Sequence, residues 1–423
     1  MHMAGLFQSM HRALTVHGLG RLLHQPSAPK PSRSPVPPRL LYVAASCLPY
    51  HISGYTARTH EILMALRAAG VNVHAFTRPG YPWDRVDRLS EAAARHTLVQ
   101  DVEYVHTPRP SNRRLLLHFA AAGARVIEQY AKANGITCIH AASNHTNALP
   151  ALIAARRLGL PFQYEMRGLW ELTRASRQPE FENSYRYNLG LELECLVAEQ
   201  ADRVFVISEQ LGQFVQKRWG IDAGKIHLLP NCVDVERIKP DPACAVLPNT
   251  IGYAGSLINY EGLDTLIDAV QLLHRQGAGV HLHIVGDGEA RPALEARVSD
   301  LGLQDHVRFF GKVTPEKARA HIAQCALVCI PRKPFTVCKV VPPIKLVEAM
   351  ALGKAVVVPD LPVFRDEAAA KAIFFAPDDA GDLAQALHGA LQDGSPHHAL
   401  ARSGLAHVQA RRQWKHFVKN LQS

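Results

Sequence analysis

From residue 39 onward the chain alternates short apolar runs with longer segments in which polar and apolar residues are mixed. The apolar runs have the length of buried strands, and the segments between them, such as 56–69 and 147–158, have the length of helices. This strand–loop–helix–strand order predicts a parallel sheet whose strands are joined by crossover helices. The strands predicted in the first half are residues 40–45, 71–76, 138–142, 162–166, 203–207 and 226–229.

The same pattern begins again after residues 235–248, which have the composition of an interdomain linker. The strands predicted there are residues 250–254, 281–285, 307–310, 326–330 and 356–358. Ligands bind beyond the carboxyl ends of the strands in open parallel sheets, so the loops after these strands should share one edge. We therefore predict an α/β protein with domains at 39–234 and 248–404. A tail at 1–38 precedes them, and a C-terminal helix at 405–423 can cross back to the first domain.

Residues 342–360 carry the most specific local pattern. They predict a helix with Pro343 at its first position, a stop at Gly353 in the left-handed conformation, and then a buried strand. Lys345 and Glu348 are three residues apart and share a face at the N-terminal end of this helix, where anions bind well. A cation there suits a diphosphate, and a carboxylate one turn later suits a sugar diol. The pattern favours binding of a nucleotide-sugar; the alternative is an ordinary amphipathic helix with two solvated charges.

The formal net charge is +10, and half of it comes from the first 39 residues, which contain no acid. Spacings typical of RNA-binding motifs or zinc fingers are absent from the sequence, so we expect no nucleic-acid partner. An anionic substrate or an anionic membrane face accounts better for a modest positive charge. The eight cysteines are scattered without a CxxC pair, which predicts reduced thiols and a cytoplasmic location.

Residues 1–25 are compatible with a basic amphipathic helix, whose apolar positions include Leu6, Phe7, Met10, Leu14 and Leu22. They lack a small-residue cleavage site, so we expect no signal peptide. A helix lying on the inner membrane face and a disordered tail are the two open alternatives. Residues 26–38 contain six prolines and predict an extended linker.

The segment 342–360 resembles the nucleotide-binding helix of family 4 glycosyltransferases, a retaining family with the GT-B fold of two Rossmann-like domains facing a central cleft. Of the two glutamates typical of that helix, the second matches Glu348 and the first falls on Val340. Further motifs of the family are matched by residues 202–209 (DRVFVISE), 231–234 (NCVD), 253–257 (YAGSL) and 284–288 (IVGDG). The resemblance extends from about residue 39 to the C-terminus.

The resemblance implies a retaining glycosyltransferase that moves a sugar from a nucleotide-sugar, UDP being the commonest nucleotide, to a glycan or lipid-linked acceptor. It implies bacterial surface or exopolysaccharide biosynthesis, with no cofactor and no metal. Two other interpretations stay open. One is a GT-B epimerase of nucleotide-sugars. The other is a catalytically silent GT-B subunit that binds nucleotide-sugar or scaffolds an active partner.

In the second domain the family uses an arginine and a lysine to stabilise the leaving diphosphate. The position of that lysine, before a glycine, is occupied here by Glu261. Lys345 is the best replacement, with Arg332 and Lys333 as further candidates; their alternative role is solvated surface charge. The donor-binding residues predicted by the resemblance are Gly54, Gly255, Ser256, Gly286, Asp287, Val313, Lys345, Leu346 and Glu348.

In the first domain, His145 precedes a predicted helix and is the candidate for the functional histidine of the family, whereas His140 lies in an apolar run and is expected in the core. Residues 164–171 resemble the YExRGLWE run of a polysaccharide-making branch. There we expect Glu165 to be catalytic, and a buried Glu165–Arg167 structural pair is the alternative. The predicted acceptor-binding residues are Tyr55, Arg167, Trp170 and Glu171.

Overall fold

The computed structural model describes residues 2–24, 38–88, 91–392 and 397–421, so the proline-rich segment predicted at 26–38 lies almost wholly outside the described residues. The chain forms two compact units. The first contains the residues up to Pro230 together with the segment that starts at Trp414, and the second contains Asn231–Gln413.

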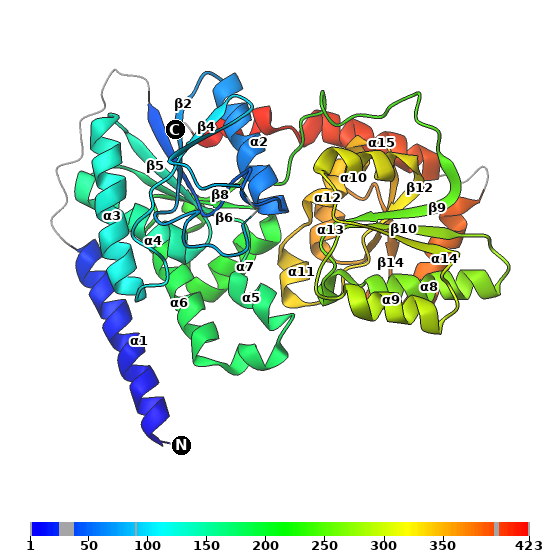
Figure 1. Ribbon diagram of the computed structural model, residues 1–423, viewed down its shortest axis with the longest axis horizontal. Helices are drawn as coiled ribbons and strands as arrows, with labels where there is room; N and C mark the ends of the chain where they lie inside the picture. Colours follow the sequence, from blue (N-terminus) through cyan, green and yellow to red (C-terminus); the bar gives the residue numbers. More distant parts are fainter. Residues whose placement is uncertain (1, 25–37, 89–90, 393–396, 422–423) are drawn as a thin grey trace. The chain divides into compact units, whose positions relative to one another are not determined.

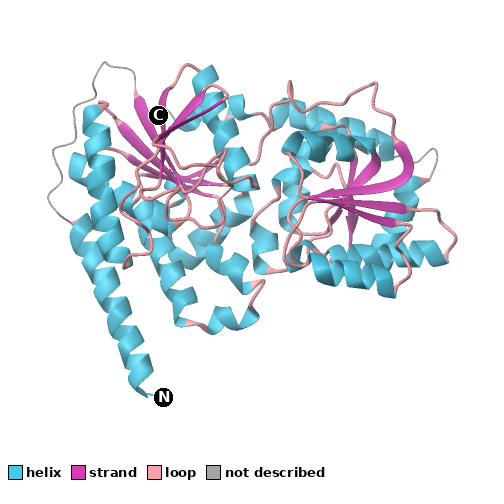
Figure 2. Cartoon of the chain, viewed as in Figure 1, coloured by secondary structure: helices cyan, strands magenta, loops and turns pink. Residues whose placement is uncertain are grey.

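The first unit is built on an eight-stranded sheet with the order β3-β4-β2-β1-β5-β6-β7-β8 (Figure 2). All neighbouring strands are parallel except β3 and β4, which pair antiparallel. The sequence missed these two strands because they are short, at the edge of the sheet, and alternate between exposed and more buried positions. The strands are β1 (Arg39–Ala44), β2 (Asn72–Thr77), β3 (His96–Val99), β4 (Val102–Val105), β5 (Cys138–Ala142), β6 (Phe162–Met166), β7 (Arg203–Val206) and β8 (Ile226–Leu228).

Helices cover this sheet and place its central strands in the core. Helix α4 packs on β5 and β6 and contacts α3, while α2 packs on β2 and on the C-terminal segment (Figure 1). The central strands are buried along almost their whole length, as expected for a parallel sheet covered by helices. The helices are α1 (His2–Leu23), α2 (Gly54–Ala68), α3 (Leu116–Ala133), α4 (His145–Leu158), α5 (Trp170–Ala175), α6 (Tyr185–Gln200) and α7 (Glu209–Trp219).

Helix α1 is an integral part of the first unit. It contacts α3, α4 and α6, and the side chains of Thr15, Leu19 and Leu23 are buried. A tail without structure is therefore wrong for residues 2–23, because the last turns of this helix have an apolar surface to pack on. Met10 and Leu14, one helical turn apart, stay exposed.

The second unit contains a six-stranded, wholly parallel sheet with the order β11-β10-β9-β12-β13-β14. The sequence predicted all of its strands except the short β14. The strands are β9 (Leu247–Ala254), β10 (His281–Val285), β11 (Val307–Gly311), β12 (Cys325–Cys329), β13 (Ala355–Pro359) and β14 (Ile373–Phe375).

The core of the second unit lies between the sheet and helices α8, α9 and α14, and α10, α12 and α15 complete its covering (Figure 1). The helices are α8 (Leu263–Arg275), α9 (Arg291–Asp300), α10 (Pro315–Gln324), α11 (Thr336–Val340), α12 (Ile344–Ala351), α13 (Pro362–Glu367), α14 (Ala380–Leu391) and α15 (His397–Arg411). Helix α15 belongs to this unit, and the return to the first unit begins at Trp414.

Helix α12 forms as predicted except at its first residue. Pro343 caps the helix in an extended conformation, with φ −80° and ψ 137°, so the first helical residue is Ile344. Gly353 follows the helix with φ 68°, a conformation that glycine adopts at little cost. The side-chain amide of Asn231 donates to the carbonyl of Pro342 at 2.9 Å and holds the segment that enters the helix.

Candidate functional site

A cluster of one carboxylate and two cations lies at the carboxyl ends of the strands in the second unit. Glu261 follows β9, Arg332 follows β12, and Lys345 lies in the first turn of α12. Arg332 donates from Nε and Nη2 to Oε1 of Glu261, at 3.1 and 2.8 Å. The ammonium of Lys345 donates to the other carboxylate oxygen at 2.8 Å and to the hydroxyl of Tyr253 at 2.7 Å. One carboxylate thus holds both predicted cations.

The electrostatics of this cluster favour the ionised form of its carboxylate. Burial alone would raise the pKa of Glu261, but Arg332 and Lys345 outweigh it and hold that pKa at about 2. Burial lowers the pKa of Lys345, and Glu261 opposes this effect. At neutral pH Glu261 is therefore ionised, and with both bases protonated the cluster carries a net charge of +1, which favours an anionic ligand.

The structure gives different outcomes for the three predicted cations. Arg332 is only 8% exposed, so the alternative of a solvated surface charge is wrong for this residue. Lys345 is likewise held by two partners, with 16% of its side chain exposed. Lys333 instead pairs with Asp264 at 2.6 Å and with Asp378 at 3.4 Å. Lys333 therefore takes part in a separate, more exposed ion-pair group.

The glycine loops around the cluster differ in part from expectation. Gly255 is a predicted donor-binding residue, but its backbone N–H already donates to the carbonyl of Val285 at 2.9 Å. The N–H of Gly286 is likewise bound to Gly311. The absence of a side chain at Gly255 matters in another way, because a Cβ there would collide with Nζ of Lys345. Gly255 thus leaves the space that the ammonium occupies.

The remaining predicted donor-binding residues of the second unit have different surroundings. The side chain of Leu346 is fully buried and packs in the core, so a contact of this residue with a donor would have to come from its backbone. Ser256 and Asp287 are exposed, and a carboxylate oxygen of Asp287 accepts from the N–H of Gly288 at 2.8 Å. Glu348 and Val313 are partly exposed.

In the first unit, Glu165 lies in a closed network of hydrogen bonds. Arg58 and Arg167 donate to Oε1 at 3.0 and 2.9 Å, and Tyr42 donates to Oε2 at 2.6 Å. A ring nitrogen of His140 lies 3.2 Å from the same Oε2, which confirms that His140 is a hydrogen-bonded core residue. Burial raises the pKa of Glu165, but the two arginines outweigh it and hold that pKa well below its usual range.

Arg167 belongs to the same network. Its Nη1 donates to the carbonyl of Tyr55 at 3.0 Å and to the hydroxyl of Thr59 at 2.8 Å, and its guanidinium stacks on the ring of Tyr55. Glu165 is 1% exposed and Arg167 8% exposed. This geometry favours the alternative to catalysis, a buried structural pair, because both oxygens of Glu165 are occupied by protein groups.

His145 is the first residue of α4 and belongs to a second buried group. Its Nδ1 lies 3.1 Å from Oε1 of Glu194, which also accepts from the backbone N–H of His145 at 2.7 Å. Tyr164 donates to the other oxygen of Glu194. Burial lowers the pKa of His145, but Glu194 and Glu171 outweigh it and raise that pKa. With Nδ1 held by a carboxylate, Nε2 is the ring nitrogen left to meet a ligand.

Glu171 completes this group and has an unusual environment. It is 6% exposed, and its Oε1 lies 3.9 Å from Nδ1 of His145, while Oε2 is buried without a hydrogen-bond partner. Burial and the charge of Glu194 raise the pKa of Glu171 to about 7. The helix α6 accommodates the carboxyl group at Gly190, where a Cβ would collide with it. Of the other predicted residues here, Trp170 is 59% exposed and Gly54 starts α2.

Two residues that the sequence analysis did not single out organise these groups. Glu194 lies on the buried face of α6, whose other members include Tyr187, Leu191 and Val197. Because this face of the helix is otherwise mostly apolar, a glutamate on it indicates a buried carboxylate. Glu261 was named only as the residue at the position of the family lysine. Nothing in the neighbouring sequence indicated the two cations that it binds.

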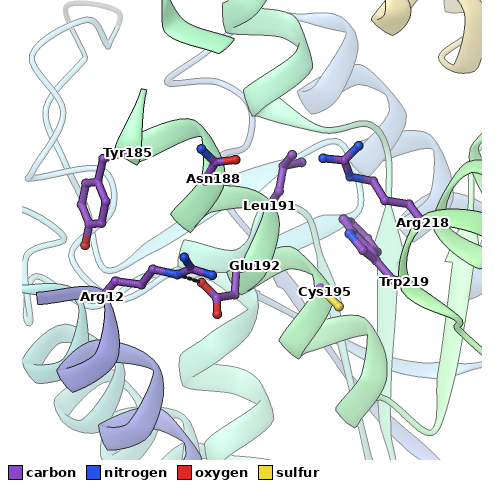
Figure 3. A pocket seen from close by; sticks show the side chains of 8 residues that line it. All are labelled: Arg12, Tyr185, Asn188, Leu191, Glu192, Cys195, Arg218 and Trp219. Carbon is purple, nitrogen blue, oxygen red and sulfur yellow. Dashed lines mark hydrogen bonds and ion pairs between the residues drawn. The ribbon is translucent and has the colours of Figure 1, made fainter. Parts of the chain in front are cut away.

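A hollow of about 390 Å³ in the first unit lies between α1, α6 and α7 (Figure 3). Arg12 of α1 and Glu192 of α6 form an ion pair across it at 2.5 Å. This pair fixes α1 to the unit rather than preparing a ligand site, because each charge already has its partner. The other lining residues are Tyr185, Asn188, Leu191, Cys195, Arg218 and Trp219.

Three general features follow from the described residues. No helix among them combines the length and the apolar character needed to cross a membrane. No group of three or more histidine, cysteine or acidic side chains in the described part of the chain is arranged to hold a metal ion. All eight cysteines lie in the described part of the chain, where none of them forms a disulfide bond, and five are buried. Metal independence and the cytoplasmic location stay predictions.

Two family models match the chain. Residues 53–232 match the model described as "Glycosyl transferase 4-like domain", and residues 248–393 match "Glycosyl transferases group 1". Among curated proteins, the chain is 33% identical over 118 residues to the GDP-mannose-dependent alpha-(1-6)-phosphatidylinositol monomannoside mannosyltransferase of Mycobacterium tuberculosis, covering 26% of this chain and 31% of the relative. It is 32% identical over 190 residues to the phosphatidyl-myo-inositol mannosyltransferase of Mycolicibacterium smegmatis, covering 42% and 46%. These matches span less than half the length of either relative.

Solved structures are similar over nearly the whole chain. Sucrose-phosphate synthase from Thermosynechococcus elongatus matches with a TM-score of 0.74 and 18% identity, covering 90% of this chain and 97% of that one. Anabaena HepE in complex with UDP matches with a TM-score of 0.67 and 18% identity, covering 90% and 98%. At this identity the likeness concerns the fold, and it confirms the predicted α/β class of the GT-B type.

Proposed function

Since the chain belongs to the family 4-like glycosyltransferases, we propose that it transfers a hexose from a nucleotide-sugar to a glycan or lipid-linked acceptor, with retention of anomeric configuration. The observation that carries the proposal is the cluster of Arg332 and Lys345 around Glu261, at the carboxyl ends of the strands of the second unit. Such ends are where open parallel sheets bind their ligands. Glu348 follows one turn later on α12, and we assign the ribose diol of the donor to it.

In this proposal the second unit supplies most of the catalytic effect by stabilising charge. When the sugar leaves, negative charge develops on the diphosphate, and donors already directed toward it lower the barrier. Lys345 and Arg332 have this role here. His145 contacts the transferred sugar or the acceptor through Nε2, because Glu194 fixes Nδ1. Trp170 and Glu171 bind the acceptor, with the indole ring stacking on a sugar face.

We propose UDP as the nucleotide and a bacterial surface or exopolysaccharide as the product. HepE, a structural neighbour, binds UDP, whereas the mycobacterial relative is GDP-mannose-dependent. Guanine and uracil differ in size and in hydrogen-bonding edge, so a direct comparison decides between them. GDP-mannose is therefore the second donor in the test.

The test has two steps on the full chain. A thermal-shift panel with UDP, GDP and their sugars identifies the nucleotide, and transfer to glycan and lipid-linked acceptors is then followed, with the product anomer assigned by NMR. We expect stabilisation by one nucleoside diphosphate and a retained anomer. Binding without transfer would support the silent-subunit alternative, and absence of binding to all nucleotides would overturn the proposal.

For the acceptor we propose that the exposed side of α1 reaches an anionic membrane surface. Met10 and Leu14 are exposed one turn apart, and the basic Arg21 lies on the same helix. Truncation of the whole helix would expose the surface that Leu19 and Leu23 cover, so point changes test the idea better. The double variant Met10→Glu/Leu14→Glu should co-sediment less with anionic liposomes at low salt than the wild type does. Equal sedimentation of both proteins would contradict this membrane contact.

A further inference from the structure

Glu261 binds both cations of the proposed donor site at once. Its Oε1 accepts two hydrogen bonds from Arg332, and its Oε2 accepts one from Lys345. We propose that Glu261 is a positioning residue that fixes Arg332 and Lys345 as one diphosphate-binding pair. This inference rests on the proposed function and explains how the chain works without the lysine that the family has at position 261.

The first argument is the geometry of Lys345. An ammonium has three N–H donors, and two of them are directed by Glu261 and by the hydroxyl of Tyr253. The ammonium also lies 4.2 Å from the centre of the Tyr253 ring. One donor remains beside these two, and the ammonium lies in the space that the missing side chain of Gly255 leaves. A flexible lysine is thereby made into a donor of fixed orientation.

The second argument is the geometry of Arg332. Its planar guanidinium carries five N–H donors. Two of them bind Glu261, and Nη1 donates to the carbonyl of Val341 at 2.9 Å. Its plane is therefore fixed at three points, while two donors remain for a ligand. Both cations thus keep unused donors in positions set by the same carboxylate, which is the property that a diphosphate site needs.

The third argument concerns charge. The family lysine would add a cation at position 261, and here that position is an anion, so the cation has moved to residue 345. Two buried cations without an anion between them would repel each other at short range. Glu261 keeps them together before a donor arrives. A simple loss of the lysine would not require a buried, ionised glutamate in its place, and Glu261 is only 3% exposed.

Positioning and charge have opposite effects on binding, so one variant can distinguish them. In Glu261→Gln the net positive charge of the cluster rises, which by itself would strengthen diphosphate binding. The two cations also lose the partner that orients them, which by itself would weaken diphosphate binding. If Glu261 is mainly a positioning residue, the second effect is the larger, and affinity falls.

The experiment is isothermal titration of the full chain with UDP, GDP and the corresponding nucleosides. For the diphosphate that binds the wild type, we expect Glu261→Gln to weaken affinity about ten-fold, the size typical of a lost charged contact, with the nucleoside nearly unchanged. Glu261→Asp keeps the charge but shortens the side chain by one methylene, and it should also weaken the diphosphate. In a Lys345→Ala background the effect of Glu261→Gln should shrink, because one of the two oriented cations is gone.

Asp264→Asn is the matched control, since Asp264 lies on the neighbouring turn and pairs with Lys333 at 2.6 Å without touching Arg332 or Lys345. It should leave diphosphate affinity at the wild-type value. Equal or tighter diphosphate binding by Glu261→Gln, or unchanged binding by Glu261→Asp, would overturn the positioning role. A wild type that binds neither UDP nor GDP would instead overturn the proposed function, so the two failures are distinguishable.

Discussion

The two units each contain a buried glutamate that binds two cations and lies beside a tyrosine. The two clusters differ in how far the hydrogen-bond donors of their cations remain accessible to a ligand. In the first, Arg58 and Arg167 around Glu165 have side chains only 3% and 6% exposed. In the second, the side chains of the two cations around Glu261 are 10% and 16% exposed. A buried ion pair is thus no sign of a binding site by itself. A cation that keeps a donor within reach of solvent is the better sign.

The remaining donors of the cations explain this difference. Arg58 directs its two terminal nitrogens to the carbonyls of Pro230 and Leu229, at 2.8 and 2.6 Å. Arg167 directs its own to Tyr55, Thr59 and Tyr42. These donors bind the protein itself, so this cluster ties strand ends and α2 together. In the cluster around Glu261, Arg332 and Lys345 bind fewer protein acceptors, namely Glu261, the carbonyl of Val341 and the hydroxyl of Tyr253.

The largest effect is expected from breaking the first cluster. Glu165→Gln leaves two buried guanidinium groups with a neutral partner, which should lower the free energy of unfolding by about 3–5 kcal/mol. All four tryptophans belong to the first unit, so urea unfolding followed by tryptophan fluorescence reports on this unit alone. Glu103→Gln, at an exposed position of β4, is the control. A loss below about 1 kcal/mol would show that Glu165 is not the structural centre described here.

A pH effect of somewhat smaller size is expected from Glu171. Its pKa is raised from 4.5 to about 7, so the folded chain keeps a proton that the unfolded chain loses near pH 4.5. Stability should therefore fall as pH rises between these values, by at most about 3 kcal/mol, and the loss is complete above pH 7. The raised pKa of His145 acts in the same direction, and Glu194 and Tyr164 are the other groups facing the carboxyl.

Glu171→Gln separates this contribution from that of His145. Urea unfolding by tryptophan fluorescence at pH 5 and pH 8 should show a clearly smaller difference in the variant than in the wild type. The same difference in both proteins would mean that Glu171 titrates normally in the folded chain.

A smaller effect, on affinity rather than stability, is expected at Glu348. If this residue holds the ribose of the donor, Glu348→Gln should weaken nucleotide binding by about 1.5–3 kcal/mol, as for a lost charged hydrogen bond. The nucleoside should lose affinity as well, because it carries the same diol. Titration with the nucleoside and its diphosphate measures both, and unchanged affinity in a folded variant would remove Glu348 from the site.

The smallest effect is expected from a more exposed ion pair in the second unit. Asp264 has 43% of its side chain exposed where it pairs with Lys333, so solvent screens the interaction. Asp264→Asn should change the free energy of unfolding by about 0–1 kcal/mol, measured by far-ultraviolet circular dichroism in urea. A larger loss would mean that the exposure of an ion pair does not predict how much the pair contributes to stability.

The sequence predicted much of the architecture because parallel strands are apolar runs bounded by turn residues. It missed β3, β4 and β14, which are too short for a reliable pattern. It also predicted Lys345 and Arg332 from their places after a strand or at a helix start. It could not predict their shared partner, because Glu261 meets Lys345 only after the chain has crossed the sheet, 84 residues later. The buried pair of Glu165 was predicted only as an alternative to catalysis, because most partners of Glu165 also come from distant parts of the sequence.

The central claim, that the second unit presents Lys345 to the diphosphate of a nucleotide-sugar, has one direct test. UDP and uridine are titrated into the wild type and into Lys345→Ala, with GDP and guanosine used instead if GDP is the nucleotide that binds. The account predicts that Lys345→Ala weakens the diphosphate by about 1.5–3 kcal/mol while leaving the nucleoside nearly unchanged. An equal loss for both ligands, or no loss for either, would contradict it.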